Sequence, residues 1–248
     1  MRRQDSKHLT SANHPQAKVG SRPIGDISPA VYSSPMPVRR RKTLLLDLDG
    51  TLTDPAEGII GSCVYALEQM GRPVTANEDF RWVIGPPLRA TFAQLLNGRG
   101  SPEEALRHYR QRYSEWGLIQ AQVYSGIHDV LLERRKMGHR LLLCTAKPAV
   151  FATRVVHHFG LAELLDGVFG PDLDGRFDDK GDLIGHIVET EGLVPDDVCM
   201  VGDREQDVRA ASRHAIPTVG VLWGYGSREE LTTAGAAVII SAPAELLD

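Results

Sequence analysis

Short apolar runs alternate with segments of helical composition from residue 43 to the end of the chain, and this alternation restricts the fold more than any other feature. The runs end in small, polar or acidic residues, and Gly138, Gly160 and Gly192 follow helical segments as C-terminal stops. This pattern predicts an α/β fold in which helices cover both faces of a parallel sheet. The expected strands are 43–48, 140–144, 167–169, 198–201, 218–222 and 238–240, and the expected helices are 126–137, 148–159, 179–191 and 204–214.

The interval 55–123 interrupts this alternation, because it has helical patterns without a convincing strand. We therefore expect an α-helical cap over 55–123, inserted after the first strand, while residues 43–54 and 124–248 form the catalytic core. The helical patterns of the interval lie near 58–70, 77–83, 87–96 and 102–116.

The first 42 residues differ in composition from the remainder. They carry nine Lys or Arg against Asp5 and Asp26, a net charge of +7, while the remainder carries −11. Five prolines, scattered serines and the lack of an apolar period leave this stretch unable to offset its ordering entropy by burial, so we expect a disordered basic tail over 1–42. Met36 precedes the first strand closely and is a candidate for the true start of a compact protein. The basic charge specifies neither nucleic-acid binding nor targeting, and neither is expected.

Cysteine usage and hydropathy exclude several classes of protein. Cys63, Cys144 and Cys199 are odd in number and widely spaced, and none begins a Cys-x5-Arg loop, which argues against a cysteine-dependent phosphatase. No apolar run approaches the roughly 20 residues that span a bilayer, and the polar N-terminus lacks the apolar stretch of a secretory signal. We expect a soluble protein in a reducing, cytoplasmic setting with no membrane partner.

Polar side chains gather where the expected strands end. The first strand runs into Asp47-Leu48-Asp49-Gly50, in which alternation sends Asp47 and Asp49 to the same side and Gly50 permits a sharp departure. Ligands of open α/β sheets bind at the carboxyl ends of the strands, so the residues leaving each strand are expected to form one site. The residues that follow the later strands are Thr145, Lys147, Lys180, Asp203 and Asp207.

This set supplies the groups that phosphoryl transfer needs: a nucleophile, a positive clamp and an acid for the leaving group. Asp47 is the expected nucleophile, which attacks phosphorus and becomes an aspartyl phosphate. Asp49 can protonate the leaving oxygen and then take a proton from the hydrolytic water. Thr145 can donate a hydrogen bond to the phosphate, and Lys180 can balance its charge. The expected catalytic residues are therefore Asp47, Asp49, Thr145 and Lys180.

The same carboxylates favour Mg²⁺, a hard cation that prefers oxygen ligands and retains several waters. The expected metal residues are Asp47, the backbone carbonyl of Asp49, and Asp203, with Asp207 orienting the shell. Asp-Leu-Asp-Gly occurs again at 172–175, but there it follows Gly-Pro in an acidic loop and lacks the ligand series of a calcium hand. The second copy is expected to be a solvated turn.

These motifs resemble the haloacid dehalogenase superfamily, in its phosphatase branch, and cover essentially all of 43–248. The resemblance implies a Rossmann-like core, covalent catalysis by the first aspartate and a cap after the first strand. The segments 84–89, 174–176 and 222–227 are similar to phosphoglycolate phosphatase-like and 5′-nucleotidase-like members. Ala146 and Arg204 depart from the family pattern, since many relatives carry a small polar residue at these positions.

Single positions separate other chemistries of the superfamily. Asp49 argues against a dehalogenase, which needs no acid two residues after the nucleophile. The absence of Lys between 43 and 135 argues against a phosphonatase, which needs a cap lysine. A sugar-phosphate mutase remains an alternative because it uses the same core motifs. A non-catalytic binding module is a second alternative, although Asp47, Asp49 and Asp203 are all present.

The cap is expected to admit small phosphorylated metabolites, either phosphoglycolate or a nucleoside 5′-monophosphate. Arg89 is the leading candidate for a substrate contact because the Gly-Pro-Pro turn fixes the start of its helix. Lys147 is a further candidate. The overall expectation is a Mg²⁺-dependent phosphomonoester hydrolase, as a monomer or a homodimer.

Overall fold

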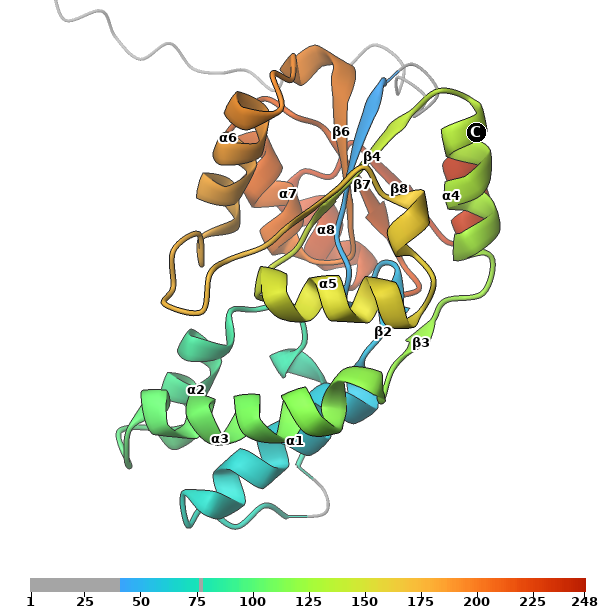
Figure 1. Ribbon diagram of the computed structural model, residues 1–248. Helices are drawn as coiled ribbons and strands as arrows, with labels where there is room; N and C mark the ends of the chain where they lie inside the picture. Colours follow the sequence, from blue (N-terminus) through green and yellow to red (C-terminus); the bar gives the residue numbers. More distant parts are fainter. Residues whose placement is uncertain (1–40, 76–77) are drawn as a thin grey trace, which may run out of the picture. The chain divides into compact units, whose positions relative to one another are not determined.

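A six-stranded parallel sheet forms the centre of the computed structural model, which describes residues 41–75 and 78–248 (Figure 1). Its strand order is β5-β4-β1-β6-β7-β8. The α/β fold predicted from the alternation is confirmed, while the expectation for residues 1–40 lies outside the described ranges. The strands are β1 (Thr43–Leu46), β4 (Arg140–Cys144), β5 (Gly167–Phe169), β6 (Val198–Gly202), β7 (Thr218–Val221) and β8 (Val238–Ile240).

Helices cover both faces of the sheet, which explains why β1 is buried at every position. Leu44 and Leu46 point into a hydrophobic cluster with α4 and α5, whereas Leu45 points into a second cluster with α6 and α7. The helices around the sheet are α4 (Ile127–Lys136), α5 (Ala149–His158), α6 (Lys180–Thr190), α7 (Glu205–Ser212) and α8 (Arg228–Ala234). Among the described residues, no helix is long and apolar enough to cross a membrane.

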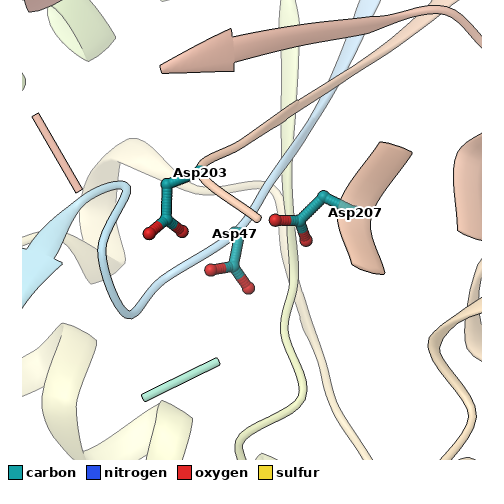
Figure 2. Close-up of side chains that lie close together, drawn as sticks. All are labelled: Asp47, Asp203 and Asp207. Atoms are coloured by element: carbon teal, nitrogen blue, oxygen red, sulfur yellow. The ribbon is translucent and has the colours of Figure 1, made fainter. Parts of the chain in front are cut away.

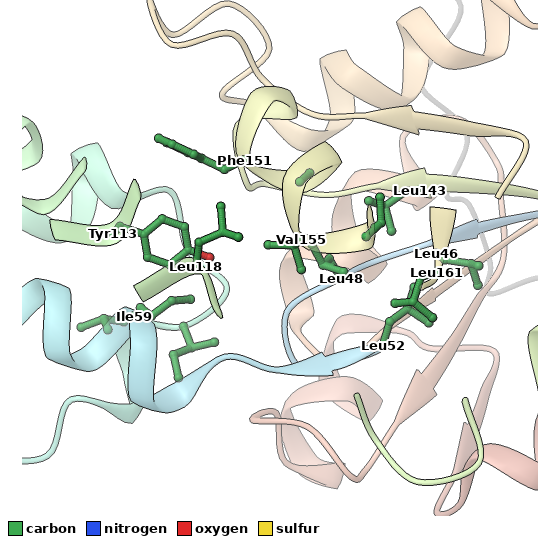
Figure 3. Close-up of a cluster of buried hydrophobic side chains, with 14 of the residues drawn as sticks. Leu46, Leu48, Leu52, Ile59, Tyr113, Leu118, Leu143, Phe151, Val155 and Leu161 are labelled. Atoms are coloured by element: carbon green, nitrogen blue, oxygen red, sulfur yellow. The ribbon is translucent and has the colours of Figure 1, made fainter. Parts of the chain in front are cut away.

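Three further helices, which we call the cap helices, lie between the short antiparallel strands β2 (Thr53–Asp54) and β3 (Gln122–Val123). Their apolar side chains belong to the same buried cluster as the α4 and α5 face of the sheet. Figure 3 shows this cluster running from Leu46 and Leu143 of the sheet to Ile59 and Tyr113 of the cap helices. The cap helices are α1 (Ala56–Gln69), α2 (Leu88–Leu96) and α3 (Pro102–Glu115).

Local signals account for most element ends. Gly138, Gly160 and Gly192 adopt φ values of +86°, +68° and +60°, so their prediction as helix stops is confirmed. Helix α3 begins at a favourable cap, because the Ser101 hydroxyl accepts from the N–H of Glu104 at 3.4 Å.

The structure differs from the sequence prediction in several segments, and helix α8 (Arg228–Ala234) and strand β2 (Thr53–Asp54) were not among the expected elements. Of the helix expected over 77–83, the described residues 78–83 form only a 3₁₀ turn, η2 (Arg81–Val83), and Pro86 and Pro87 prevent its extension toward α2. Strand β3 was not expected because it pairs for only two residues with β2, a segment distant in sequence, and no local pattern marks it.

Helix α1 approaches the turn η3 (Gly117–Ile119) closely at Gly58. A Cβ at Gly58 would lie 1.9 Å from the carbonyl oxygen of Gly117, whereas a Cβ at Gly61 of the same helix would meet nothing within 4 Å. We expect Gly58→Ala to lower the free energy of unfolding by about 1–3 kcal/mol through overpacking. Gly61→Ala, the matched control, is expected to raise it by about 0.5–1 kcal/mol through reduced chain entropy. Urea denaturation measures both, and equal stability of the two variants would contradict the close approach.

Candidate active site

Asp47 lies at the carboxyl edge of the sheet, directly after β1. Its N–H donates to the carbonyl of Val201 in β6 at 3.0 Å, so strand pairing continues through this residue and fixes its backbone. The chain then turns at Gly50, which has φ +91° and donates its N–H to the carbonyl of Thr53 at 2.7 Å. The side chains of Asp47 and Asp49 are nearly buried and both line the same pocket.

Asp203 and Asp207 approach Asp47 from β6 and α7. Asp203 follows the last residue of β6 and is fully buried, and its Oδ2 accepts from the N–H of Tyr225 at 2.7 Å. Asp207 lies in the first turn of α7, where its Oδ2 accepts from the N–H of Arg204 at 3.0 Å. One carboxylate oxygen of each residue is therefore held by the backbone and orients the other.

Glycines allow the backbone to approach these carboxylates. A Cβ at Gly50 would lie 2.2 Å from Oδ2 of Asp203, and a Cβ at Gly224 would lie 2.4 Å from the same atom. A Cβ at Gly202 would lie 2.3 Å from Oδ2 of Asp207. The acidic cluster thus depends on positions where no side chain is tolerated.

Asp47, Asp203 and Asp207 each offer an oxygen within 4.8 Å of the others, and Figure 2 shows the three side chains grouped together. Burial, above all, raises the pKa of Asp47 to about 7; Lys180 opposes this rise, and the carboxylates of Asp207 and Asp49 add to it. Burial, followed by the charges of Asp207 and Asp47, also raises the pKa of Asp203 well above its usual range. Crowded, buried, all-oxygen donors of this kind fit a divalent cation such as Mg²⁺.

Lys180 is the positive partner within this cluster. Its Nζ lies 2.7 Å from Oδ1 of Asp47 and also contacts Oδ1 of Asp207. Burial opposes the charge, but the carboxylates of Asp207 and Asp47 outweigh it and raise the pKa of Lys180. Asp179 fixes the position of this lysine at the start of α6, because its carboxylate accepts from the N–H of Asp182 at 2.9 Å.

Thr145 and Lys147 follow β4 and reach the same pocket. The Thr145 hydroxyl accepts from the N–H of Lys147 at 3.2 Å, and its own N–H donates to the carbonyl of Phe169 at 3.1 Å. Nζ of Lys147 lies 2.6 Å from Oδ1 of Asp49 and 2.8 Å from the hydroxyl of Tyr113. Lys147, predicted as a substrate contact, is therefore also the partner of Asp49.

A cavity of about 370 Å³ lies between the carboxyl edge of the sheet and the cap helices. Residues from α2 and α3 form much of its wall, together with Phe151 of α5 and the loop before Lys180. Of the residues predicted from the sequence, those that line this cavity are Asp47, Asp49, Arg89, Thr145, Lys147, Lys180 and Asp207. Asp203 is fully buried and does not line the cavity.

Arg89, the predicted substrate contact, already has protein partners. Its guanidinium forms ion pairs with Glu103 of α3 and with Asp178, the latter at 3.4 Å between Nε and Oδ2. Binding of a substrate anion would require Arg89 to share or exchange these partners. The side chain lines the cavity, but its charge is compensated.

Sequence reasoning missed two contacts that connect the segment 55–123 to the core, one made by Tyr113 and one by Arg204. Tyr113 is buried and contacts Lys147, and its spacing of four from Tyr109 marks an apolar helix face that could have pointed to it. Arg204 donates from Nη1 to the carbonyl of Ile84 at 2.6 Å and from Nε to Glu230 at 2.9 Å. No local pattern marks this contact, because Ile84 is distant in sequence.

Comparison with known proteins identifies the family. Residues 44–221 match the family described as haloacid dehalogenase-like hydrolase. The chain belongs to the haloacid dehalogenase-like hydrolase family. It is 38% identical over 193 residues to a 5′-nucleotidase of Pseudomonas aeruginosa, covering 77% of this chain and 87% of the relative. It is 36% identical over 199 residues to tyrosine-protein kinase PtkA of Mycobacterium tuberculosis, covering 80% of this chain and 68% of the relative.

A crystal structure of a predicted phosphatase from Clostridium acetobutylicum is similar in fold, with a TM-score of 0.80 and 37% identity. The likeness covers 83% of this chain and 96% of that chain. The haloacid dehalogenase resemblance and the prediction of a phosphomonoester hydrolase are thereby confirmed at the level of family and enzyme class.

Tyr113 and Tyr109 allow a controlled test of the contact between α3 and Lys147 in this hydrolase. Their rings are stacked with centroids 5.4 Å apart and both are buried, but only the Tyr113 hydroxyl has a hydrogen bond among the described residues. We expect Tyr113→Phe to lower the free energy of unfolding by about 1–2 kcal/mol, because a buried ammonium loses a partner. Tyr109→Phe should change it by less than about 0.5 kcal/mol. Chemical denaturation measures both, and a larger loss for Tyr109→Phe would refute the assignment.

Proposed function

We propose that this hydrolase is a cytoplasmic, Mg²⁺-dependent phosphatase that acts on small phosphomonoesters through an aspartyl phosphate on Asp47. The observation that carries the proposal is the buried cluster of Asp47, Asp203 and Asp207, whose oxygens lie within 4.8 Å of one another and two of whose members line the cavity walled by the cap helices. Lys180 bridges Asp47 and Asp207 within this cluster. A nucleophilic carboxylate, a cation site and a fixed ammonium at one point are the parts that phosphoryl transfer requires.

In the first half-reaction, an oxygen of Asp47 attacks phosphorus, and the bond from phosphorus to the leaving oxygen breaks. Asp49 donates a proton to that oxygen, so the alcohol departs neutral. Thr145 donates a hydrogen bond to the phosphate, and Lys180 balances its charge. Lys147, 2.6 Å from Asp49, holds the acid at the edge of the cavity.

In the second half-reaction, water attacks the phosphorus of the aspartyl phosphate. Asp49, now ionised, accepts a proton from that water, and the bond between phosphorus and Asp47 breaks to release inorganic phosphate. Mg²⁺ would be held by Asp47, Asp203 and the backbone carbonyl of Asp49, with Asp207 orienting the shell, and supplies positive charge that neutralises the phosphate oxygens. One carboxylic acid thus serves both half-reactions.

The substrate proposed here is phosphoglycolate or a nucleoside 5′-monophosphate. The cavity of about 370 Å³ lies within the range of small-molecule sites, about 300–1,000 Å³, which suits a compact leaving group. The 5′-nucleotidase of Pseudomonas aeruginosa supports the nucleotide.

Metal dependence follows from the acidic cluster. We expect phosphate release from a metabolite panel to require Mg²⁺, to stop in excess chelator and to return when Mg²⁺ is restored. Ca²⁺ should not replace Mg²⁺, because its larger and looser coordination misaligns attack. Mg²⁺ is also expected to raise the Tm, since it binds the folded state. Full turnover in chelator would rule out the metal proposal.

The role of Asp47 is tested by Asp47→Asn, which keeps the shape of the side chain but removes the nucleophile. We expect kcat to fall on the order of a thousand-fold or more. Asp172→Asn is the matched control, because it alters the first residue of the second Asp-Leu-Asp-Gly copy and lies outside the cavity wall. Circular dichroism should show both variants folded. Comparable activity of the two variants would exclude covalent catalysis by Asp47.

A further inference from the structure

Helix α3 presents one face to the cavity. Leu106, Tyr109, Arg110 and Tyr113 all line it, at the spacing of three and four residues that places side chains on one side of a helix. The three uncharged members of this face are buried, and Arg110 is half-buried. A charged side chain therefore lies in an apolar row that faces the site.

The guanidinium of Arg110 has no hydrogen bond or ion pair to any residue in the part of the chain that the structure describes, which distinguishes it from the neighbouring arginines. Arg89 is paired with Glu103 and Asp178, and Arg107 is paired with Glu104. Burial, followed by the nearby Arg89 guanidinium, lowers the pKa of Arg110, while Asp178 raises it. Arg110 therefore lines the cavity with a guanidinium that has no hydrogen-bond acceptor among the described residues.

We propose that Arg110 binds the leaving group of the substrate, and that this group presents hydrogen-bond acceptors, without donors, to the guanidinium. The inference rests on the proposed function and deepens it. Guanidinium carries five N–H donors in a planar fork and no acceptor, so it pairs with a carboxylate or with two adjacent acceptor atoms. If the leaving group placed an amino group at this point, its N–H donors would face the N–H donors of Arg110, which disfavours binding.

Two sources can supply this acceptor chemistry to the cavity. Phosphoglycolate offers a carboxylate, and ethyl phosphate is its counterpart without one. Inosine 5′-monophosphate offers the O6 and N7 acceptor pair that arginine commonly recognises on oxopurines, whereas adenosine 5′-monophosphate has an amino group in place of O6. Phenyl phosphate has no acceptor outside its phosphate and reports the chemical step alone.

The test compares Arg110→Met with Arg107→Met in the full chain with Mg²⁺. Arg107 is the matched control, because it lies on the same helix with 63% of its side chain exposed and does not line the cavity. We expect Arg110→Met to lower kcat/KM by about 10-fold to 100-fold for phosphoglycolate or for inosine monophosphate. The substrate that loses activity identifies the source of the acceptor. The kcat/KM for phenyl phosphate, and for the matched substrate that lacks the acceptor, should change by less than about threefold.

Arg110→Lys provides a second variant that keeps the charge and loses the fork, and it should retain an intermediate activity on the sensitive substrate. An equal loss on phenyl phosphate would assign Arg110 a structural role and overturn the proposal. Unchanged activity on every substrate, or a wild-type enzyme that does not distinguish either pair, would also overturn it. Hydrolysis of phenyl phosphate by the wild type tests the proposed function separately, so the two failures are distinguishable.

Discussion

Several buried carboxylates around a single ammonium form the constraint on which the rest of this structure depends. Asp47, Asp203 and Asp207 each place a carboxylate oxygen within 4.8 Å of the others, and Lys180 bridges two of them. Removing an ion from water costs several kcal/mol, and like charges at this distance add to that cost. One lysine cannot balance three acids and an incoming phosphate. A further cation is therefore needed to balance the charge of this cluster. The surrounding fold has to hold the acids in place until that cation binds.

The sheet provides that hold through its strand ends and its backbone. Pairing of β1 with β6 fixes Asp47, and the N–H groups of Tyr225 and Arg204 fix Asp203 and Asp207. Glycine at 50, 202 and 224 is needed because any Cβ there would meet a carboxylate below 2.5 Å. The glycines therefore let the backbone come close to the acids, and backbone N–H groups replace part of the hydration that the carboxylates lose on burial.

Much of this arrangement was predictable from the sequence because its signals are local. The apolar runs locate the strands, and the polar residues that follow them include the six cavity-lining core residues named from the sequence. The contacts of the cap helices were not predictable in the same way. Arg89 and Arg110 are both arginines on helical patterns, and nothing local distinguishes the one that pairs with Glu103 and Asp178 from the one that does not. That difference arises only when α2, α3 and the loop at Asp178 come together.

The cap side and the core side of the cavity are therefore constrained differently. Among the described residues, the hydrogen bonds of Asp47, Asp203 and Asp207 all come from the core, so substitutions in α2 and α3 can alter the leaving-group side without disturbing the acidic cluster. The contact from Tyr113 through Lys147 to Asp49 is the exception, because it connects α3 to the proposed acid. In the proposed mechanism, changes at other cavity-lining positions of α3 would affect contacts with the leaving group, whereas a change at Tyr113 would also reach Asp49, the proposed proton donor.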